Sequence, residues 1–169
     1  WEYLLAIYEK YPIHELIIHP RIQTDMYRGV PRLGAYEKAV NRLKMPLCYN
    51  GNLFSAADYK RITERFPDTC CFMYGIGLIT NPGLVTEIRE GIRQDKKTVR
   101  EFHDCLFEEY RDLLSGVRNV LFRLKELWSY MAVNFTNYEK YAKKIKKSQH
   151  LSEYSSVVSS LFAEQDLID

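Results

Sequence analysis

Three short motifs hold the residues best suited to chemistry, and each stands where a buried strand is expected to end. They are His19-Pro20-Arg21, Asn50-Gly51-Asn52 and Gly75-Ile76-Gly77, which follow the apolar runs 16–18, 46–49 and 70–74. The carboxyl ends of parallel strands lie at one edge of a sheet, so loops at that edge converge on a shared site. The spacing therefore predicts one binding site built from three loops.

The two glycine motifs suit a phosphate group. Glycine lets backbone N–H groups approach an oxyanion closely, and the N-terminus of a following helix adds partial positive charge. In (β/α)8 barrels such phosphate sites follow the last two strands, which would place these strands at the end of a barrel. Taken singly, Asn-Gly is also typical of an ordinary turn, and Gly-x-Gly of a tight strand-to-helix connection.

His19 and Arg21 occupy alternate positions after the first strand, so their side chains are expected to point to the same side. Facing an anionic ligand, the histidine could act as a neutral donor or proton carrier and the arginine as a permanent charge. A structural role is the alternative, with Arg21 paired to a barrel carboxylate and His19 hydrogen-bonded in a core. The residue types alone leave both interpretations open.

The first half alternates helical and strand patterns. Helical spacing of apolar residues covers 2–10, 33–43 and 56–65, with Ser55 as an N-cap of the last. Asn81-Pro82 is expected to start another helix, with Asn81 as its cap. Strands separated by helices at intervals of about 25–30 residues predict βαβ units and a parallel sheet.

From Arg93 onward only helical patterns remain, over 98–114, 117–134, 137–147 and 151–163. The predicted fold class is therefore α/β: the C-terminal part of a (β/α)8 barrel, with about three parallel strands, followed by an all-α helical bundle. The predicted domains are residues 1–92 and 93–169. Trp128 is expected to anchor the core of the bundle.

Charge is distributed unevenly between these parts. The 169 residues carry a net charge of +2 and are 46% hydrophobic, which excludes a polycation and a disordered chain. Residues 93–147 hold thirteen basic and eight acidic groups, a local charge of +5. Clustered cations with interleaved aromatic residues could neutralise RNA phosphates. Lysines near a helix C-terminus also complement the helix dipole, so a solvated face is the alternative.

The cysteines Cys48, Cys70, Cys71 and Cys105 form no C-x-x-C pair. Their spacing suits neither a zinc site nor a disulfide framework, so we predict buried, inert thiols, no metal and a reducing, cytoplasmic location. No run of eighteen apolar residues predicts a membrane span. The first residue is Trp1 rather than methionine, and we expect the chain to begin inside a longer protein.

Read in order, E-L-I-I-H-P-R-I-Q-T-D-M-Y-R-G, P-L-C-Y-N-G-N and F-M-Y-G-I-G-L-I-T-N-P-G-L resemble the tRNA-dihydrouridine synthases, as do R-E-F-H-D and R-N-V-L-F-R-L-K-E-L-W in the helical half. The resemblance implies an FMN-binding barrel followed by a helical domain that helps to hold tRNA. In that family NADPH reduces the flavin, hydride passes to the uracil C5=C6 bond, and a cysteine supplies the proton.

Carried over by position, the resemblance implies two sets of site residues. The FMN-binding set is His19, Asn50, Gly51, Asn52, Gly75, Ile76 and Gly77. The set facing uracil or tRNA is Arg21, Arg118, Arg123, Lys143, Lys144 and Lys147. The family's proton-donating cysteine and its first barrel strands have no counterpart here. We therefore expect no catalytic residue in this chain, no activity of the chain alone, and pairing with the missing half of the barrel or with a second copy.

Two positions depart from the family pattern, which usually has Asp in place of Asn52 and Arg in place of Ile76. Loss of that arginine removes a fixed cation near the phosphate, so FMN must bind more weakly or use another cation. A noncatalytic RNA-binding relative is the alternative function. A different phosphate-binding barrel is a third, but a small substrate would not need the basic helical extension.

Overall fold

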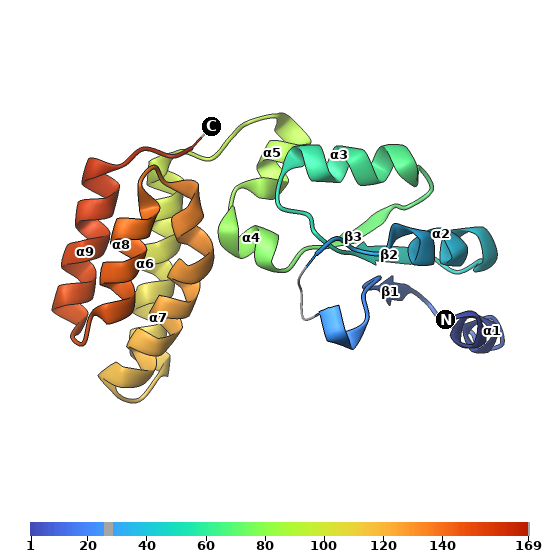
Figure 1. The fold of residues 1–169 in the computed structure, drawn as a ribbon, viewed down its shortest axis with the longest axis horizontal. Coiled ribbons are helices and arrows are strands. Elements are labelled where there is room, and N and C mark those ends of the chain that lie inside the picture. Colours follow the sequence, from blue (N-terminus) through green and yellow to red (C-terminus); the bar gives the residue numbers. More distant parts are fainter. Residues whose placement is uncertain (26–28, 169) are drawn as a thin grey trace. The chain divides into compact units, whose positions relative to one another are not determined.

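In the computed structural model, residues 1–25 and 29–168 are described, and the chain divides into two compact units. The sheet unit, Trp1–Gly75, and the helical unit, Ile76–Asp169, are shown in Figure 1. The sheet unit contains α1 (Glu2–Tyr8), β1 (Leu16–Ile18), η1 (Gln23–Asp25), α2 (Leu33–Arg42), β2 (Leu47–Asn50), α3 (Ala56–Arg65) and β3 (Cys71–Met73). The boundary between the two units lies at Gly75/Ile76. The predicted division into functional domains at residues 92/93 stays a prediction.

The strands form one parallel sheet in the order β1-β2-β3. Leu16 pairs with Leu47 between β1 and β2, and Cys48 pairs with Cys71 between β2 and β3. Since α2 connects β1 to β2 and α3 connects β2 to β3, each connection is a βαβ crossover. The predicted α/β class is confirmed, as expected for part of a (β/α)8 barrel followed by a helical part.

The two faces of this sheet differ. Leu47 and Tyr49 point into a core that contains Tyr36 of α2 and Ile62 of α3, all of them buried. The Tyr36 and Tyr49 rings meet edge to face, with their centroids 5.0 Å apart. Because side chains alternate along a strand, Cys48 and Asn50 point to the opposite face. In a complete barrel that face would line the interior.

Local capping explains where α3 begins. The Oγ of Ser55 accepts a hydrogen bond from the Asp58 N–H at 3.1 Å, and its hydroxyl donates to the Asp58 carboxylate at 2.9 Å. These two bonds satisfy an otherwise unpaired donor of the first turn and fix the entry of the chain into the helix. The predicted N-cap is confirmed.

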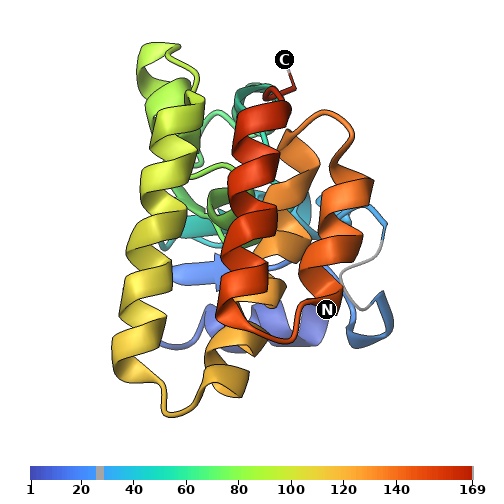
Figure 2. The same cartoon turned by 90° about the vertical axis from the view of Figure 1, so that its left-hand side faces the viewer.

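The helical unit contains α4 (Ile76–Thr80), α5 (Leu84–Glu90), α6 (Lys96–Leu113), α7 (Val117–Met131), η2 (Ala132–Asn134), α8 (Tyr138–Lys147) and α9 (Leu151–Glu164). Figure 2 looks onto its long helices, with α6 and α9 side by side. Trp128 of α7 is 1% exposed in the centre of their core, as predicted, and the Phe162 ring of α9 packs against it at 6.0 Å. Asp95 caps α6 by accepting from the Thr98 N–H at 2.7 Å.

The prediction that Asn81-Pro82 starts a helix was wrong. The helix α5 begins at Leu84 with Gly83 as its N-cap, and the amide of Asn81 donates to the Glu87 carboxylate at 3.0 Å. A side chain at Gly83 would place its Cβ 2.7 Å from the Cβ of Gln94, so this close approach requires glycine. The tertiary contact with Gln94, rather than a local cap, sets the start of α5.

The cysteines are not uniformly buried. Cys48 is 2% exposed, whereas Cys70 and Cys105 are exposed at the surface. The prediction of four buried thiols was therefore wrong for these two, because Cys70 precedes β3 and Cys105 faces away from the bundle core. None of the described helices combines the length and apolar character needed to cross a membrane.

Candidate functional site

The loops after β1 and β2 meet, as the motif spacing predicts. The Nδ1 of His19 lies 3.0 Å from the Asn50 carbonyl oxygen, and the guanidinium of Arg21 donates to the Asn52 Oδ1 at 2.6 Å. A carbonyl only accepts, so the Nδ1 of His19 carries the proton in this hydrogen bond. Arg21 also donates to the Gly29 carbonyl at 2.8 Å. Tyr27 and Arg28, part of the first motif string, lie outside the described residues.

A side chain also joins the ends of β2 and β3. The amide of Asn50 donates to the Met73 carbonyl at 2.8 Å, across the last register pair of the two strands. The loop after β2 and the loop that leads to Gly75 are thereby held at the same edge of the sheet. The predicted set His19, Arg21, Asn50 and Asn52 is brought together by these contacts.

Gly51 is required by close packing. A Cβ at this position would lie 2.2 Å from the Tyr49 hydroxyl oxygen, whereas one at Gly75 would meet nothing within 4 Å. Tyr49 is 1% exposed, and its burial raises the pKa of its hydroxyl to about 12. The backbone of the loop therefore lies directly over a fixed, neutral phenol.

Two backbone donors at this edge have no acceptor among the described residues. The N–H groups of Asn52 and Gly75 make no hydrogen bond in the part of the chain that the structure describes. In the helical unit, Ile76 and Gly77 form the first turn of α4, where N–H groups have no partner within the helix. Unpaired donors of this kind suit an anion with several oxygen atoms.

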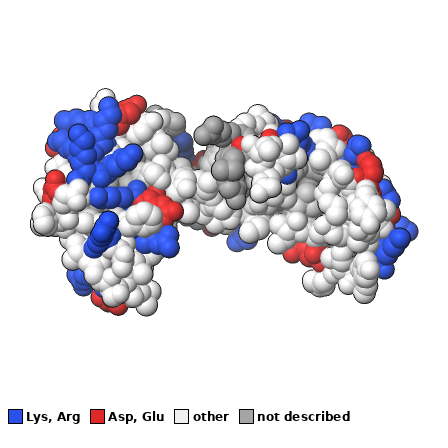
Figure 3. Space-filling model, turned by 60° about the horizontal axis from the view of Figure 1, so that its bottom comes forward, with Lys and Arg blue, Asp and Glu red and all other residues white. Residues whose placement is uncertain are grey.

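The helical unit carries its cations on exposed helix faces, and Figure 3 shows Lys and Arg gathered on it. Two hollows adjoin the exposed ring of Phe122 on α7, one of about 600 Å³ and one of about 460 Å³. Both contain Phe122 and Lys125, the first also contains Arg118, and the second also contains Lys143 and Lys146. We call these two spaces the basic hollows.

Only part of the predicted tRNA set lines the basic hollows. Arg118 and Lys143 do, whereas Lys144 and Lys147 are exposed on α8 without lining them. Arg123 stacks its guanidinium 5.8 Å from the Phe122 ring centroid and donates to Glu126 at 2.9 Å. Lys125 and Lys146 also line the basic hollows; they belong to the same basic cluster of the sequence but were not in the predicted tRNA set.

The family model for dihydrouridine synthase (Dus) matches residues 4–164, which covers both the strand-end loops and the helical unit. The chain belongs to the dihydrouridine synthase family. Proteins of this family are FMN-dependent flavoenzymes that act on tRNA. A search of curated proteins finds no match.

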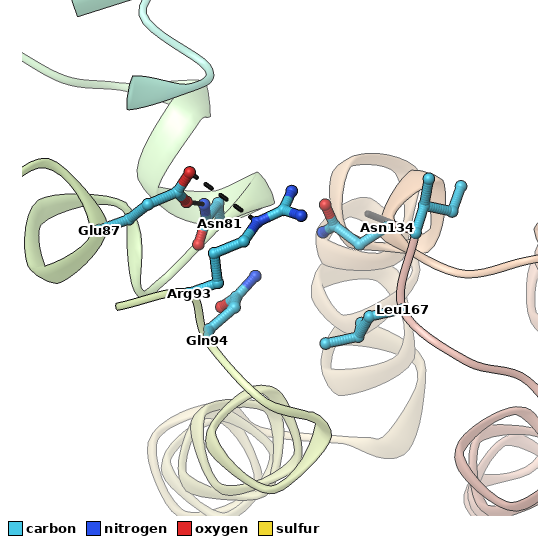
Figure 4. Close-up of a pocket in the computed structure, with 7 residues that line it drawn as sticks. Asn81, Glu87, Arg93, Gln94, Asn134 and Leu167 are labelled. Carbon is cyan, nitrogen blue, oxygen red and sulfur yellow. Dashed lines mark hydrogen bonds and ion pairs between the residues drawn. The ribbon is translucent and has the colours of Figure 1, made fainter. Parts of the chain in front are cut away.

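The helical unit of this dihydrouridine synthase chain also contains a small polar pocket of about 130 Å³, shown in Figure 4. Asn81, Glu87 and Arg93 point toward one another there, with the Arg93 Nε 4.0 Å from the Glu87 carboxylate. The Asn81 Oδ1 is buried and has no partner among the described residues. Glu87 of α5 thus bonds to Asn81 in the turn after α4 and to Arg93 in the segment before α6.

A buried polar network, which sequence reasoning missed, crosses the helical core. Trp128 Nε1 donates to the Tyr154 hydroxyl at 2.7 Å, and that hydroxyl lies 2.7 Å from Nε2 of His103. On the other side of the ring, Nδ1 lies 2.8 Å from the Asp104 carboxylate. Desolvation lowers the pKa of His103, partly opposed by Asp104, so the ring is held in its neutral form. Only the string R-E-F-H-D hinted at this pair.

Proposed function

We propose that this chain supplies the FMN-phosphate loops and part of the tRNA-binding surface of an enzyme that reduces uridine to 5,6-dihydrouridine in tRNA, with NADPH as the reductant. Membership of the dihydrouridine synthase family carries the proposal. The observation that supports it in this chain is the meeting of the loops after β1 and β2, tied by the His19 and Arg21 hydrogen bonds, with the Asn50 amide bonded to the end of β3.

The residues present fit an FMN phosphate. The N–H groups of Asn52 and Gly75 make no hydrogen bond with described residues, and a dianionic phosphate needs such donors. We assign Asn50, Gly51, Asn52, Gly75, Ile76 and Gly77 to the phosphate, with Ile76 contributing only its backbone. His19 is assigned to the flavin. When bound, FMN supplies the hydride that reduces the uracil C5=C6 bond.

We propose that Arg21 takes over the role of the arginine that the family usually has at position 76. Its partner Asn52 is a neutral amide, whereas an aspartate at this position would place a negative charge directly beside the guanidinium. We propose that Arg21 raises the positive potential beside the phosphate loops and borders the entry of the uracil. The two departures from the family pattern, Asn52 and Ile76, then compensate each other in charge.

The tRNA surface is proposed on the helical unit. Arg118, Lys125, Lys143 and Lys146 surround an exposed aromatic ring, an arrangement suited to phosphates and an unstacked base. Arg123, Lys144 and Lys147 add charge nearby on the same helices. Binding through dispersed cations of this kind depends strongly on salt.

Catalysis also needs groups that the described residues do not provide. The sheet has three strands where a (β/α)8 barrel has eight, and none of the four cysteines is assigned as the proton donor. We propose that the remaining strands come from the N-terminal half of the same barrel, or from a second copy. A cytoplasmic location, where tRNA is modified under reducing conditions, is part of the proposal.

The full-length protein provides the test. It should purify with a flavin absorbance spectrum or bind added FMN, and it should convert uridine to dihydrouridine in unmodified tRNA when NADPH is supplied. A protein that binds neither FMN nor tRNA contradicts the proposal. Salt-dependent tRNA binding without FMN would instead support the noncatalytic RNA-binding relative.

A further inference from the structure

A second cluster of reactive side chains lies at the opposite end of the sheet from the strand-end loops. Glu15 immediately precedes β1, Cys48 is near the start of β2, and Cys71 is the first residue of β3. The carboxylate oxygen and the two Sγ atoms all lie within 4.8 Å of one another. Three neighbouring strands thus each contribute one potential ligand atom.

The register of the sheet explains why these groups meet. Cys48 and Cys71 are direct partners in the parallel pairing of β2 with β3, so both sulfurs lie on the same face. This is the face opposite to Leu47 and Tyr49, away from the helices that cover the core. Glu15 and Cys48 are 33 residues apart in the sequence, and Cys48 and Cys71 are 23 residues apart. A search for C-x-x-C motifs therefore does not find this cluster.

The donor set and its spacing select one class of metal ion. Two sulfurs bound to one tetrahedral zinc ion, each at about 2.3 Å, lie about 3.8 Å apart. The atoms of the cluster are already within 4.8 Å, so small side-chain rotations would close the site. Cys48 is buried and fixed on a strand, whereas Glu15 is exposed and can turn toward an ion. Soft thiolates disfavour Mg²⁺ and Ca²⁺, which prefer oxygen ligands.

We propose that Glu15, Cys48 and Cys71 bind a thiophilic divalent cation of the Zn²⁺ class, with water in the fourth position. Both thiols lose their protons to solvent as the two metal–sulfur bonds form, and the carboxylate supplies the third bond. The ion would tie together the amino ends of β1, β2 and β3. This role is independent of the proposed cofactor site, which lies at the carboxyl ends of the strands.

Cobalt spectroscopy on the full-length protein tests the proposal. The protein is stripped of metal under reducing conditions and titrated with Co²⁺, which gives an intense thiolate-to-cobalt charge-transfer absorbance. We expect saturation at one equivalent, and displacement of Co²⁺ by added Zn²⁺. The double variant Cys48→Ser/Cys71→Ser should lose the absorbance, and Glu15→Gln should weaken Zn²⁺ binding at least roughly tenfold, as expected for loss of a direct ligand.

Two matched variants keep the test decisive. Cys105→Ser removes an exposed thiol on α6, and Cys70→Ser removes the thiol next to Cys71 that is not a member of the cluster. Both should retain the absorbance of the wild type. Glu15→Gln changes an exposed side chain, so it remains informative if the double cysteine variant fails to fold. Absence of a charge-transfer band, or its loss in Cys70→Ser alone, would overturn the proposal.

Discussion

The two candidate surfaces of this chain hold their polar groups in different ways. In the sheet unit, the side chains of Arg21 and Asn50 donate hydrogen bonds of 2.6–2.8 Å to neighbouring loops. These bonds hold both side chains in fixed orientations. On the helical unit, Lys143 and Lys146 make no ion pair or hydrogen bond with any residue that the structure describes. The first arrangement suits one small anion, and the second suits a long polyanion whose phosphates can be contacted in several registers.

The largest effect expected from this difference is on the helical unit. Replacing Arg118, Lys125, Lys143 and Lys146 together by glutamine removes four cations, so tRNA affinity at low salt should fall on the order of 100-fold. The slope of log affinity against log salt should become shallower by about 3 units, because each lost phosphate contact accounts for about 0.7–0.9. Filter binding or fluorescence anisotropy over a salt series measures both.

A control with four other lysines separates location from total charge. None of Lys10, Lys44, Lys60 and Lys97 lines the basic hollows, and Lys60 and Lys97 face Glu64 and Glu101 at 3.8 and 3.7 Å. Their replacement by glutamine should leave the salt slope almost unchanged. Equal losses in the two quadruple variants would show that net charge, rather than this surface, binds tRNA.

Close packing beneath the strand-end loops gives the next effect. In Gly51→Ala the new methyl group would overlap the buried Tyr49 hydroxyl, so the free energy of unfolding should fall by about 1–3 kcal/mol, the usual cost of overpacking. FMN binding should weaken as the loop moves. Gly34→Ala in α2, where a Cβ meets nothing within 4 Å, is the matched control and should not lower stability. Denaturant unfolding and FMN fluorescence would be measured for both variants. Equal stability and equal FMN binding of Gly51→Ala and Gly34→Ala would reject close packing at Gly51.

Charge compensation between Asn52 and Ile76 predicts a smaller effect. Asn52→Asp should weaken FMN binding about tenfold by cancelling the charge of Arg21, and Ile76→Arg should strengthen it about tenfold by adding a cation. The double variant should bind nearly as the wild type does. Ile92→Arg, at an exposed position, controls for added charge in general. A double variant that binds FMN as weakly as Asn52→Asp alone, or an Ile76→Arg variant that binds no more tightly than the wild type, would remove the basis for assigning Arg21 to the phosphate.

Sequence patterns predicted the repeated elements but not the contacts between distant segments. The parallel strands and the Ser55 cap were predictable because period, spacing and capping act over a few residues. The start of α5 was not, because it depends on Gln94, and the exposure of Cys105 depends on which helix face the bundle covers. The motif order predicted that the loops meet, whereas the hydrogen bond from His19 to the Asn50 carbonyl depends on tertiary geometry.

The buried network of the helical unit gives the smallest and most local effect. The Tyr154 hydroxyl accepts from Trp128 and can donate to His103 when Nε2 is unprotonated, and Asp104, itself bonded to Arg100 at 2.8 Å, holds Nδ1. The pKa of His103 is lowered by burial, so between that value and about 6.5 the unfolded chain binds a proton that the folded chain does not. Stability of the helical unit is therefore complete above pH 6.5 and falls as the pH drops, by at most about 1.4 kcal/mol per pH unit.

Hydrogen exchange provides a local measurement of this pH dependence. Protection of α6 and α9, corrected for the intrinsic exchange rate, should decrease between pH 7.5 and 5.5 in the wild type. In His103→Gln the same helices should be less protected at pH 7.5 but should lack the additional decrease, because glutamine does not titrate. Asp104 titrates well below this window, since Arg100 and His103 lower its pKa. Parallel profiles for the two proteins would show that His103 does not couple protonation to the packing of the helical core.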